Sequence, residues 1–416
     1  MAVAVIGGGI VGMSTAWSLR RRGEEVTVIE RGSIGESASG VNAGWVTPSL
    51  STPLASPGVV GLGLTHALDP NGALSIRPRL DTDWIRWLWK FARAARPSAY
   101  ESGVRALLHL NRHTLELFDE FHDDGVDFEM HSAGLLALAQ SADGLKWFSQ
   151  LFDQLVPMGF PGRVEYLSGD EARQRDAAVG LGVQAAAHTS IDRHVNPESL
   201  LQGLHKRVTE MGVTVLQHTA VEAVTPAGTG WSIRLPDTSL DVDQVVVALG
   251  VATNTILAPL GFTLPIIGAK GYSIDIRGAG TSPRHALYLM EPKLGLSPYH
   301  DALRIAGAFE LPARDERVPE QRIRNLVDQV HPYLAGWAPD ARVDARAGRA
   351  GLRPATPDSL PFIGPVPGHH GLYIAAGHGM LGVTLAPATA EGIAEMITTR
   401  RIPEPMLPFQ LAGRTR

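Results

Sequence analysis

The sequence predicts an α/β fold with two domains. A strand and a helix joined by a glycine-rich turn occur near the start of the chain, within residues 2–30, and again near its end, within residues 372–398. Helices and a separate set of strands are predicted between these two units. A chain of 416 residues also exceeds the usual size of a single hydrophobic core. We therefore expect a discontinuous Rossmann-like domain and an inserted α+β domain built on a mostly antiparallel sheet.

The first thirty residues carry the pattern of a dinucleotide site. A short apolar run leads into the glycine turn 7–12, and a second apolar run ends in Glu30. Gly7 permits the tight turn, Gly9 lets the backbone approach a pyrophosphate, and Gly12 lets the helix pack closely on the strand. Glu30 can accept hydrogen bonds from a ribose. We assign to this site Gly7, Gly9, Ile10, Val11, Gly12, Glu30 and Arg31.

The elements that follow are predicted from composition and periodicity. Small and polar residues dominate 31–44, which predicts a loop whose backbone lies close to a ligand. Residues 47–80 are rich in proline and glycine and should form further loops. From Asp81 onward, apolar residues at spacings of three and four predict a helix. The later runs predict helices over 107–121, 197–211, 321–330 and 385–398, and strands over 135–139, 213–216, 242–249, 271–276, 286–290, 303–306 and 372–376.

These elements suggest where the two domains divide. The nucleotide domain is expected to comprise residues 1–80, 150–255 and 345–416. The second domain, which would hold the substrate, is expected to comprise residues 81–149 and 256–344.

Composition and charge exclude several classes of protein. The apolar content of 44% and the charged content of 19% are typical of a globular chain. A net charge of −5 without a long basic stretch argues against a nucleic-acid partner. The absence of cysteine excludes disulfides, thiolate metal sites, a cysteine nucleophile and a cofactor tethered through cysteine. His109 and His113 lie one helical turn apart without a convergent acid pair, so we expect no metal site.

The sequence favours a cytoplasmic protein. No signal peptide is expected before the first strand, and no apolar run reaches the ~18 residues that span a bilayer. Trp84, Trp87 and Trp89 form a cluster with two interpretations. The cluster either packs in the core, or makes a peripheral contact with the inner face of the membrane or with a partner.

Five segments together resemble a known family. They are GGGIVG at 7–12, SGVNAGWVTP at 39–48, KGYSI at 270–274, GLRPATPDSLPFIG at 351–364 and GHGMLGVT at 377–384. The chain resembles the D-amino-acid oxidase-type flavoproteins over nearly its whole length. Among these it is most similar to the bacterial D-amino acid dehydrogenases.

The resemblance implies FAD, bound non-covalently with its isoalloxazine between the two domains. The loop that passes the pyrophosphate and flavin would be formed by Ser39, Gly40, Asn42, Ala43 and Gly44. Reduced flavin is anionic near N1 and O2, and the start of a helix can stabilise that charge. Near that part of the flavin the resemblance places Gly379, Met380, Leu381, Gly382, Val383 and Thr384, and we add Gly351 to the cofactor residues.

Four residues are candidates for the catalytic site. Arg353 matches the arginine that binds the substrate carboxylate in the family, and a guanidinium binds a carboxylate through two parallel hydrogen bonds. A structural salt bridge is the alternative for Arg353. Tyr272 is a candidate for support of the carboxylate or for core packing. Lys270 is a candidate for a place near the flavin or on the surface. His378 is a candidate for acid–base chemistry or for packing beside the flavin.

The resemblance implies oxidative deamination of a small amino acid, with a D-amino acid favoured. A hydride would pass from Cα to flavin N5 and leave an imino acid, which hydrolyses to a keto acid. The electron acceptor would be a quinone or oxygen. Three alternatives stay open: a glycine- or sarcosine-type oxidase, an oxidase of cyclic imino acids, and a flavin-binding subunit that needs a partner.

Overall fold

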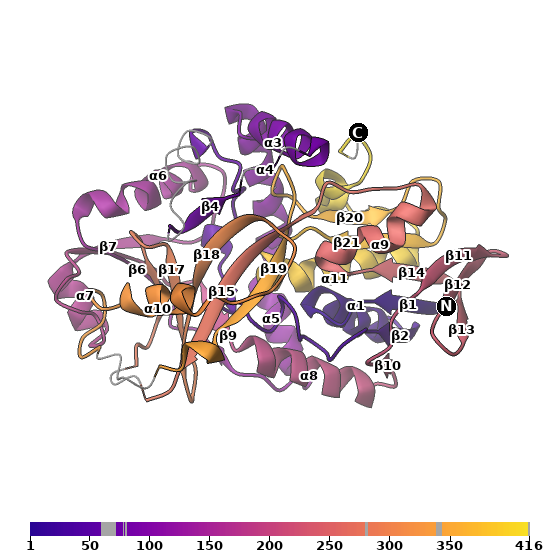
Figure 1. Ribbon diagram of the computed structural model, residues 1–416, viewed down its shortest axis with the longest axis horizontal. Coiled ribbons are helices and arrows are strands. Elements are labelled where there is room, and N and C mark those ends of the chain that lie inside the picture. The colour runs from indigo at the N-terminus through magenta and orange to yellow at the C-terminus, as the bar shows by residue number, and fades with distance from the viewer. Residues whose placement is uncertain (60–71, 78, 80, 279–281, 338–342, 415–416) are drawn as a thin grey trace.

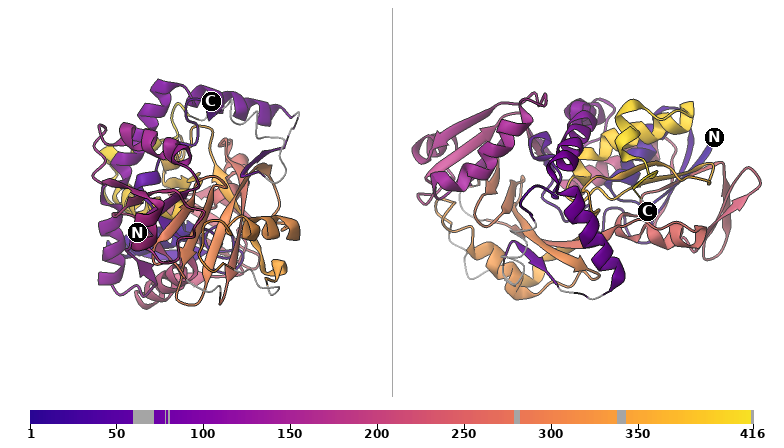
Figure 2. Two further views of the ribbon diagram at one scale, coloured as in Figure 1. Left: turned by 90° about the vertical axis from the view of Figure 1, so that its left-hand side faces the viewer. Right: turned by 90° about the horizontal axis from the view of Figure 1, so that it is seen from above.

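The computed structural model contains two main β-sheets that lie side by side (Figures 1 and 2). It describes residues 1–59, 72–77, 79, 81–278, 282–337 and 343–414. Within this part of the chain, none of the helices combines the length and the apolar character needed to cross a bilayer.

The smaller sheet has six strands in the order β10–β2–β1–β14–β21–β20. Neighbours pair in parallel except β20, which runs antiparallel to β21. The sheet combines strands from both ends of the chain, as the sequence predicts, with β10 and β14 from its middle. The strands are β1 (Ala2–Ile6), β2 (Glu25–Ile29), β10 (Thr214–Leu216), β14 (Gln244–Val247), β20 (Phe362–Pro365) and β21 (Leu372–Ala376).

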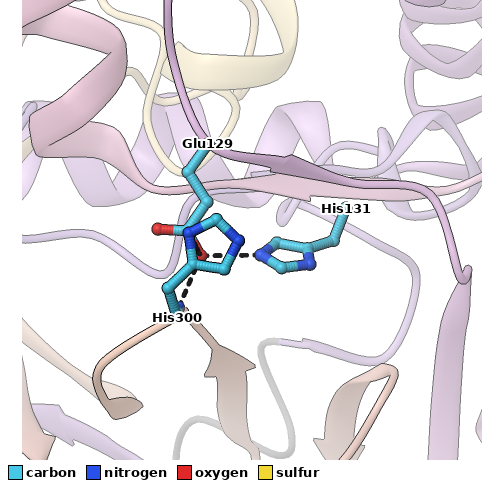
Figure 3. Close-up of side chains that lie close together, drawn as sticks. All are labelled: Glu129, His131 and His300. Carbon is cyan, nitrogen blue, oxygen red and sulfur yellow. Dashed lines mark hydrogen bonds and ion pairs between the residues drawn. The ribbon is translucent and has the colours of Figure 1, made fainter.

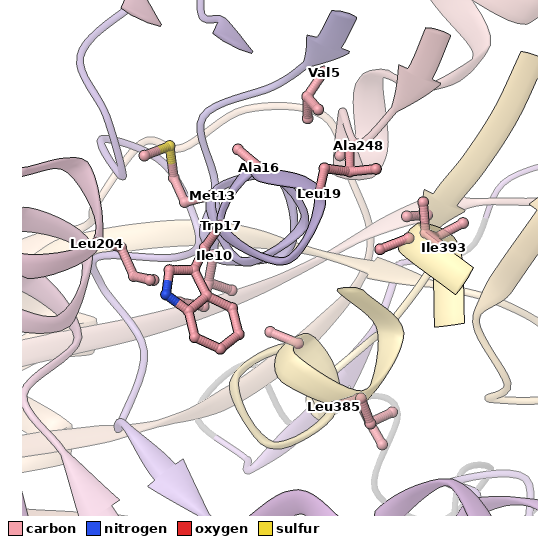
Figure 4. Packing of buried hydrophobic residues seen from close by; sticks show 14 of the residues in the cluster. Val5, Ile10, Met13, Ala16, Trp17, Leu19, Leu204, Ala248, Leu385 and Ile393 are labelled. Atoms are coloured by element: carbon pink, nitrogen blue, oxygen red, sulfur yellow. The ribbon is translucent and has the colours of Figure 1, made fainter. Parts of the chain in front are cut away.

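Helices α1 (Ile10–Arg21) and α11 (Gly382–Thr399) pack against each other beside this sheet, with α8 (Pro197–Glu210) next to α1. Figure 4 shows the apolar cluster between them, with Trp17 at its centre. The Trp17 indole is buried, meets the ring of Phe121 edge-on at 4.7 Å, and donates its N–H to Asp124. The core thus includes residues of α5 (Thr114–Asp123), which was expected in the second domain.

The larger sheet has nine strands in the order β19–β15–β18–β17–β16–β6–β8–β7, with β4 also paired to β18. Helix α10 (Glu320–Asp328) packs on one face of β15 and β18. The strands are β4 (Leu74–Ile76), β6 (Leu135–Ala139), β7 (Val164–Ser168), β8 (Ala185–Thr189), β15 (Ile267–Ile276), β16 (Ala286–Leu289), β17 (Leu294–Pro298), β18 (Leu303–Ala313) and β19 (Arg349–Ala355).

Shorter elements complete the fold. Two three-stranded sheets have the orders β11–β12–β13 and β3–β9–β5. The strands are β3 (Trp45–Val46), β5 (Met130–His131), β9 (Arg193–Val195), β11 (Ala223–Ala227), β12 (Gly230–Arg234) and β13 (Ser239–Val242). The helices are α3 (Thr82–Ala94), α4 (Pro97–Leu110), α5 (Thr114–Asp123), α6 (Lys146–Leu155), α7 (Gly169–Arg175) and α9 (Asn254–Leu257).

The structure corrects several expected boundaries. Strands β7, β8 and β19 belong to the larger sheet, although residues 150–255 and 345–416 were expected in the nucleotide domain. The helix predicted over 107–121 is divided at residues 111–113. The loop region 47–80 contains β4, and its residues 60–71, 78 and 80 lie outside the described part of the chain.

The three tryptophans of the predicted cluster lie in two different environments. Trp84 and Trp87 are buried in a small cluster with Ala269 and Leu311, whereas Trp89 is 57% exposed. Core packing is therefore confirmed for Trp84 and Trp87.

One buried arginine links the larger sheet to the loop that follows Glu30. Arg304, on β18, forms a two-bond ion pair with Asp275 of β15, at 2.7 and 2.9 Å. The same guanidinium donates to the backbone carbonyls of Gly40 and Asn42, at 3.1 and 3.0 Å. Because the side chain is enclosed, the carbonyls of Gly40 and Asn42 depend on it for a partner, whereas Asp275 also pairs with Arg349.

We expect Arg304→Met to lower the free energy of unfolding by about 1.5–3 kcal/mol, because charge-assisted hydrogen bonds are lost while apolar volume is kept. Urea denaturation measures this change. Arg234→Met is the control, because the Arg234–Glu222 pair is exposed and should contribute less than about 0.5 kcal/mol. Equal stability of the two variants would contradict the role of Arg304.

Candidate active site

A cavity of about 860 Å³ lies where the two sheets meet. It opens at the carboxyl ends of four parallel strands, where Ile6, Ile29, Ala248 and Ala376 line it, and at β19, where Arg353 lines it. Ligands of doubly wound α/β folds bind at this edge of the sheet. The volume lies in the range of about 300–1,000 Å³ that cofactor and ligand pockets occupy.

The glycine turn has the geometry expected for close approach to a dinucleotide. Gly7 has a φ of +116°, and a Cβ there would collide with the carbonyl oxygen of Ala248. A Cβ on Gly12 would collide with the carbonyl oxygen of Gly7, so α1 can cross the strand only with glycine there. Gly9 faces Ser39, whose Oγ would lie 3.0 Å from an added Cβ. Gly7 and Gly9 line the cavity, and Gly12 supports the turn from behind.

The carboxylate of Glu30 lines the cavity and holds the turn at the same time. Its two oxygens accept the backbone N–H groups of Gly8 and Gly32, at 2.7 and 2.9 Å. A carboxylate oxygen has a second acceptor position, so Glu30 can still accept a ribose hydroxyl. Ser39 Oγ accepts from the N–H of Ile10 at 3.0 Å, at the start of α1. Ile10, Val11, Arg31 and Ser39 also line the cavity.

The remainder of the loop is fixed by its own hydrogen bonds. Asn42 donates its side-chain amide to the Ser39 carbonyl at 2.6 Å and accepts from the N–H of Gly44 at 2.7 Å. The carbonyl of Ala43 accepts from the hydroxyls of Ser297 and Tyr299, at 2.6 and 3.0 Å. Of the loop residues expected to bind the cofactor, Ser39 and Asn42 line the cavity. Gly40, Ala43 and Gly44 shape the loop instead.

The second glycine turn brings the start of α11 to the cavity. Gly379, Met380, Gly382 and Val383 line it, as the sequence predicts. Gly379 donates its N–H to the carbonyl of Pro354 at 3.0 Å, which ties this turn to the end of β19. The positive end of the α11 dipole therefore meets the cavity.

Three other residues that were expected to bind the cofactor do not line the cavity. Leu381 is the N-cap residue of α11, and Thr384 is buried with its hydroxyl 3.1 Å from the carbonyl of Trp45, to which it donates. Gly351 lies beneath the loop, since a Cβ there would be 2.6 Å from the Val41 side chain. These residues hold the loop against α11 and β19.

Arg353 has the environment of an anion-binding residue. Arg353 lines the cavity, and its guanidinium donates to the carbonyl of Ala308 at 3.0 Å and lies 5.5 Å from the ring centre of Phe309. Within the described residues, no carboxylate forms an ion pair with it. Burial lowers the pKa of Arg353 to about 10, so the charge persists at neutral pH. The structure thus offers no support for a salt-bridge role.

Tyr272 and Lys270 do not face the cavity, and their expected catalytic roles are corrected. Arg353 pairs with Ala269 across β19 and β15, so successive residues of β15 alternate between the two faces of the sheet. Tyr272 is buried in the apolar cluster beneath α10, and its burial raises the pKa of its hydroxyl. Lys270 is 3% exposed and forms an ion pair with Asp315 at 2.9 Å.

His378 lines the cavity but lacks the features of an acid–base group. Its Nε2 is 3.0 Å from the hydroxyl of Thr389 on α11, so that nitrogen already has a hydrogen-bond partner. Burial lowers the pKa of His378 to about 3, so the ring stays neutral at physiological pH. This arrangement favours packing over proton transfer.

The residues that support the site were not predicted from the sequence. Arg304 fixes the loop, and Leu249, Gly250 and Ala252 line the cavity after β14. A single arginine in an apolar strand does not indicate a place in a site, and small apolar residues after a strand carry no distinctive chemistry. Only the pairing of distant strands identifies them.

Comparisons with known proteins agree with this geometry. The family model described as "FAD dependent oxidoreductase" matches residues 2–396. D-amino acid dehydrogenase 2 of Ralstonia nicotianae is 30% identical, over 99% of this chain and 100% of the relative. D-amino acid dehydrogenase of Vibrio vulnificus is 28% identical, over 96% of each chain.

The fold is shared with solved structures. Glycine oxidase from Geobacillus kaustophilus superimposes with a TM-score of 0.77 at 21% identity, over 99% of this chain and 98% of that one. L-proline dehydrogenase from P. horikoshii superimposes with a TM-score of 0.71 at 21% identity, over 97% and 95%. The glycine turn, the cavity and the start of α11 all fit FAD as the cofactor.

Glu30→Ala should weaken FAD binding, because the ribose would lose one or two hydrogen bonds of about 0.5–3 kcal/mol each. Titration of the apoprotein with FAD measures the affinity. Thermal unfolding of the same apoprotein reports separately on the loss of the contacts to Gly8 and Gly32. An unchanged FAD affinity would mean that Glu30 does not bind the ribose.

Proposed function

Because the chain belongs to the family of FAD-dependent oxidoreductases, we propose that it oxidises a small amino acid at Cα, with a D-amino acid as the favoured substrate. The cavity-lining guanidinium of Arg353 carries this proposal. The names of the full-length relatives support a D-amino acid as substrate. FAD is held without a covalent bond in this proposal, and the absence of cysteine excludes a thioether link.

The role of Arg353 follows from its surroundings. A charged group taken from water is stable only when it is paired or hydrogen-bonded. The single backbone acceptor on Ala308 leaves most of the five N–H donors of Arg353 for a ligand. A carboxylate can accept two of these donors in parallel, which fixes the orientation of the substrate as well as its position.

The chemistry requires little acid–base assistance from the protein. With FAD bound, Cα can release a hydride to flavin N5, and water hydrolyses the resulting imino acid to a keto acid and ammonia. The chain's own contribution is orientation by Arg353 and charge stabilisation at the start of α11. A substrate whose amine is already neutral needs no general base, which is consistent with a neutral His378.

Substitution of Arg353 tests the proposal. Arg353→Ala should lower kcat/KM for amino acids by about thirtyfold to several thousandfold, which corresponds to ~2–5 kcal/mol for one partner of a desolvated charge pair. Arg353→Lys should also lower kcat/KM, because lysine keeps the positive charge but lacks the two parallel N–H donors of a guanidinium. The FAD spectrum should stay nearly unchanged. Kinetics with a dye acceptor and a panel of D-amino acids, L-amino acids, glycine, sarcosine and D-proline measure the effect.

Arg349→Lys is the matched control on the same strand. Arg349 lies on the same face of β19 but pairs with Asp275 and Glu198, so this variant should change kcat/KM by less than about threefold. Wild-type flavin reduction in Arg353→Ala would contradict the anchoring role and favour an amine oxidase.

The same assay separates the alternatives. Peroxide formation in air would favour a glycine- or sarcosine-type oxidase, and preference for D-proline would favour an oxidase of cyclic imino acids. An inactive monomer with bound FAD would favour a subunit that needs a partner. We propose a quinone or oxygen as the electron acceptor.

We also propose a cytoplasmic location with peripheral membrane contact through α3. Ile85 and Trp89 are 54% and 57% exposed on this helix, and the guanidinium of Arg93 lies 4.8 Å from the Trp89 ring centre. Trp89→Ser should reduce sedimentation with anionic vesicles, whereas Trp147→Ser on α6 should not. Equal sedimentation of the wild type, Trp89→Ser and Trp147→Ser would contradict a membrane contact through α3.

A further inference from the structure

A cluster of two histidines and one glutamate lies outside the cavity residues (Figure 3). Glu129 and His131 come from the chain at β5, and His300 comes from the turn between β17 and β18. We propose that Glu129, His131 and His300 bind a divalent transition-metal ion, with Zn²⁺ as the ion of best-matched chemistry. The proposal does not depend on the reaction proposed above.

The distances within the cluster suit such an ion. One ligand atom from each residue lies within 4.8 Å of the others. Glu129 Oε1 is 2.7 Å from His131 Nε2 and 3.7 Å from His300 Nδ1. Zinc bonds of about 2.0–2.1 Å in tetrahedral geometry place ligand atoms roughly 3.3–3.5 Å apart. Small side-chain rotations would reach this spacing, with the ion replacing the hydrogen bond between Glu129 and His131.

Two of the three ligands are held in place by neighbouring groups. Glu129 Oε2 accepts the side-chain amide of Asn196 at 3.1 Å, and Oε1 accepts the backbone N–H of His300 at 2.7 Å. The His131 ring stacks on the buried ring of His194, with centres 4.6 Å apart. Contacts of this kind orient metal ligands and raise affinity.

The third ligand is accessible from solvent. The His300 side chain is 79% exposed, so an ion can enter from that side, and water would complete its coordination. Two imidazoles and one carboxylate are donors that suit zinc and its neighbours, whereas calcium and magnesium prefer oxygen ligands alone.

The bound ion would join two parts of the fold that support the cofactor loop. Tyr299, next to His300, donates its hydroxyl to the carbonyl of Ala43 at 3.0 Å. Strand β5 pairs with β9, and β9 pairs with β3 directly after the loop. An ion that connects His131 to His300 would therefore connect the larger sheet to the β3–β9–β5 sheet and stabilise the folded state.

The test uses the FAD-loaded protein after removal of metals with a chelator. Calorimetric titration with Zn²⁺ should show one equivalent bound, and Co²⁺ should give the visible spectrum of a nitrogen- and oxygen-ligated ion. At a Zn²⁺ concentration 100 times the dissociation constant, the unfolding equilibrium constant should fall about a hundredfold. His300→Ala should weaken Zn²⁺ binding at least about tenfold, and Glu129→Gln should do the same.

His109→Ala is the matched control. His109 contacts Glu404 at 3.0 Å, and no third ligand joins this pair among the residues that the structure describes, so this variant should bind Zn²⁺ as tightly as the wild type. His300→Ala should fold normally, because the side chain is mostly exposed. Three results would overturn the proposal: no stoichiometric Zn²⁺ binding by the wild type, equal affinity in His300→Ala, or loss of binding in His109→Ala alone.

Discussion

The rest of this structure depends on one constraint: Arg353 lines the cavity, and no carboxylate among the described residues pairs with its guanidinium. Enclosing the charge of Arg353 costs free energy that a single backbone acceptor offsets only in part. Despite this cost, the surrounding residues fix the position of the guanidinium. Gly271 leaves room for the guanidinium, since a Cβ there would collide with it, and Pro354 stiffens the strand beyond it. This arrangement supports the binding role that we propose for Arg353.

The two sheets bring Arg353 and the glycine turn to the same cavity, in which we propose that the cofactor binds. The carboxyl edge of the parallel sheet contributes the glycine turn and Glu30, and the larger sheet contributes β19 with Arg353. Between them lies the loop 38–45, anchored by Ser273, Ser297 and Arg304 of the larger sheet. The substrate would therefore meet the cofactor at a junction that neither sheet could form alone.

Local patterns explain which parts of this arrangement could be predicted. The glycine turn, Glu30 and the start of α11 each lie in one continuous segment, where spacing reports directly on geometry. Tyr272 and Lys270 were misplaced because the face that a strand residue occupies depends on its pairing with distant strands. The membership of β7, β8 and β19 in the larger sheet was missed for the same reason. The cluster of Glu129, His131 and His300 has no sequence spacing to reveal it, since the turn that carries His300 is far along the chain.

The most direct measurement is a crystal structure of the FAD-bound protein with an unreactive carboxylate ligand. We expect a carboxylate that accepts two hydrogen bonds of about 2.7–2.9 Å from Arg353, with the ligand between that residue and the flavin. A ligand carboxylate bound elsewhere, with Arg353 contacting only the carbonyl of Ala308, would contradict it.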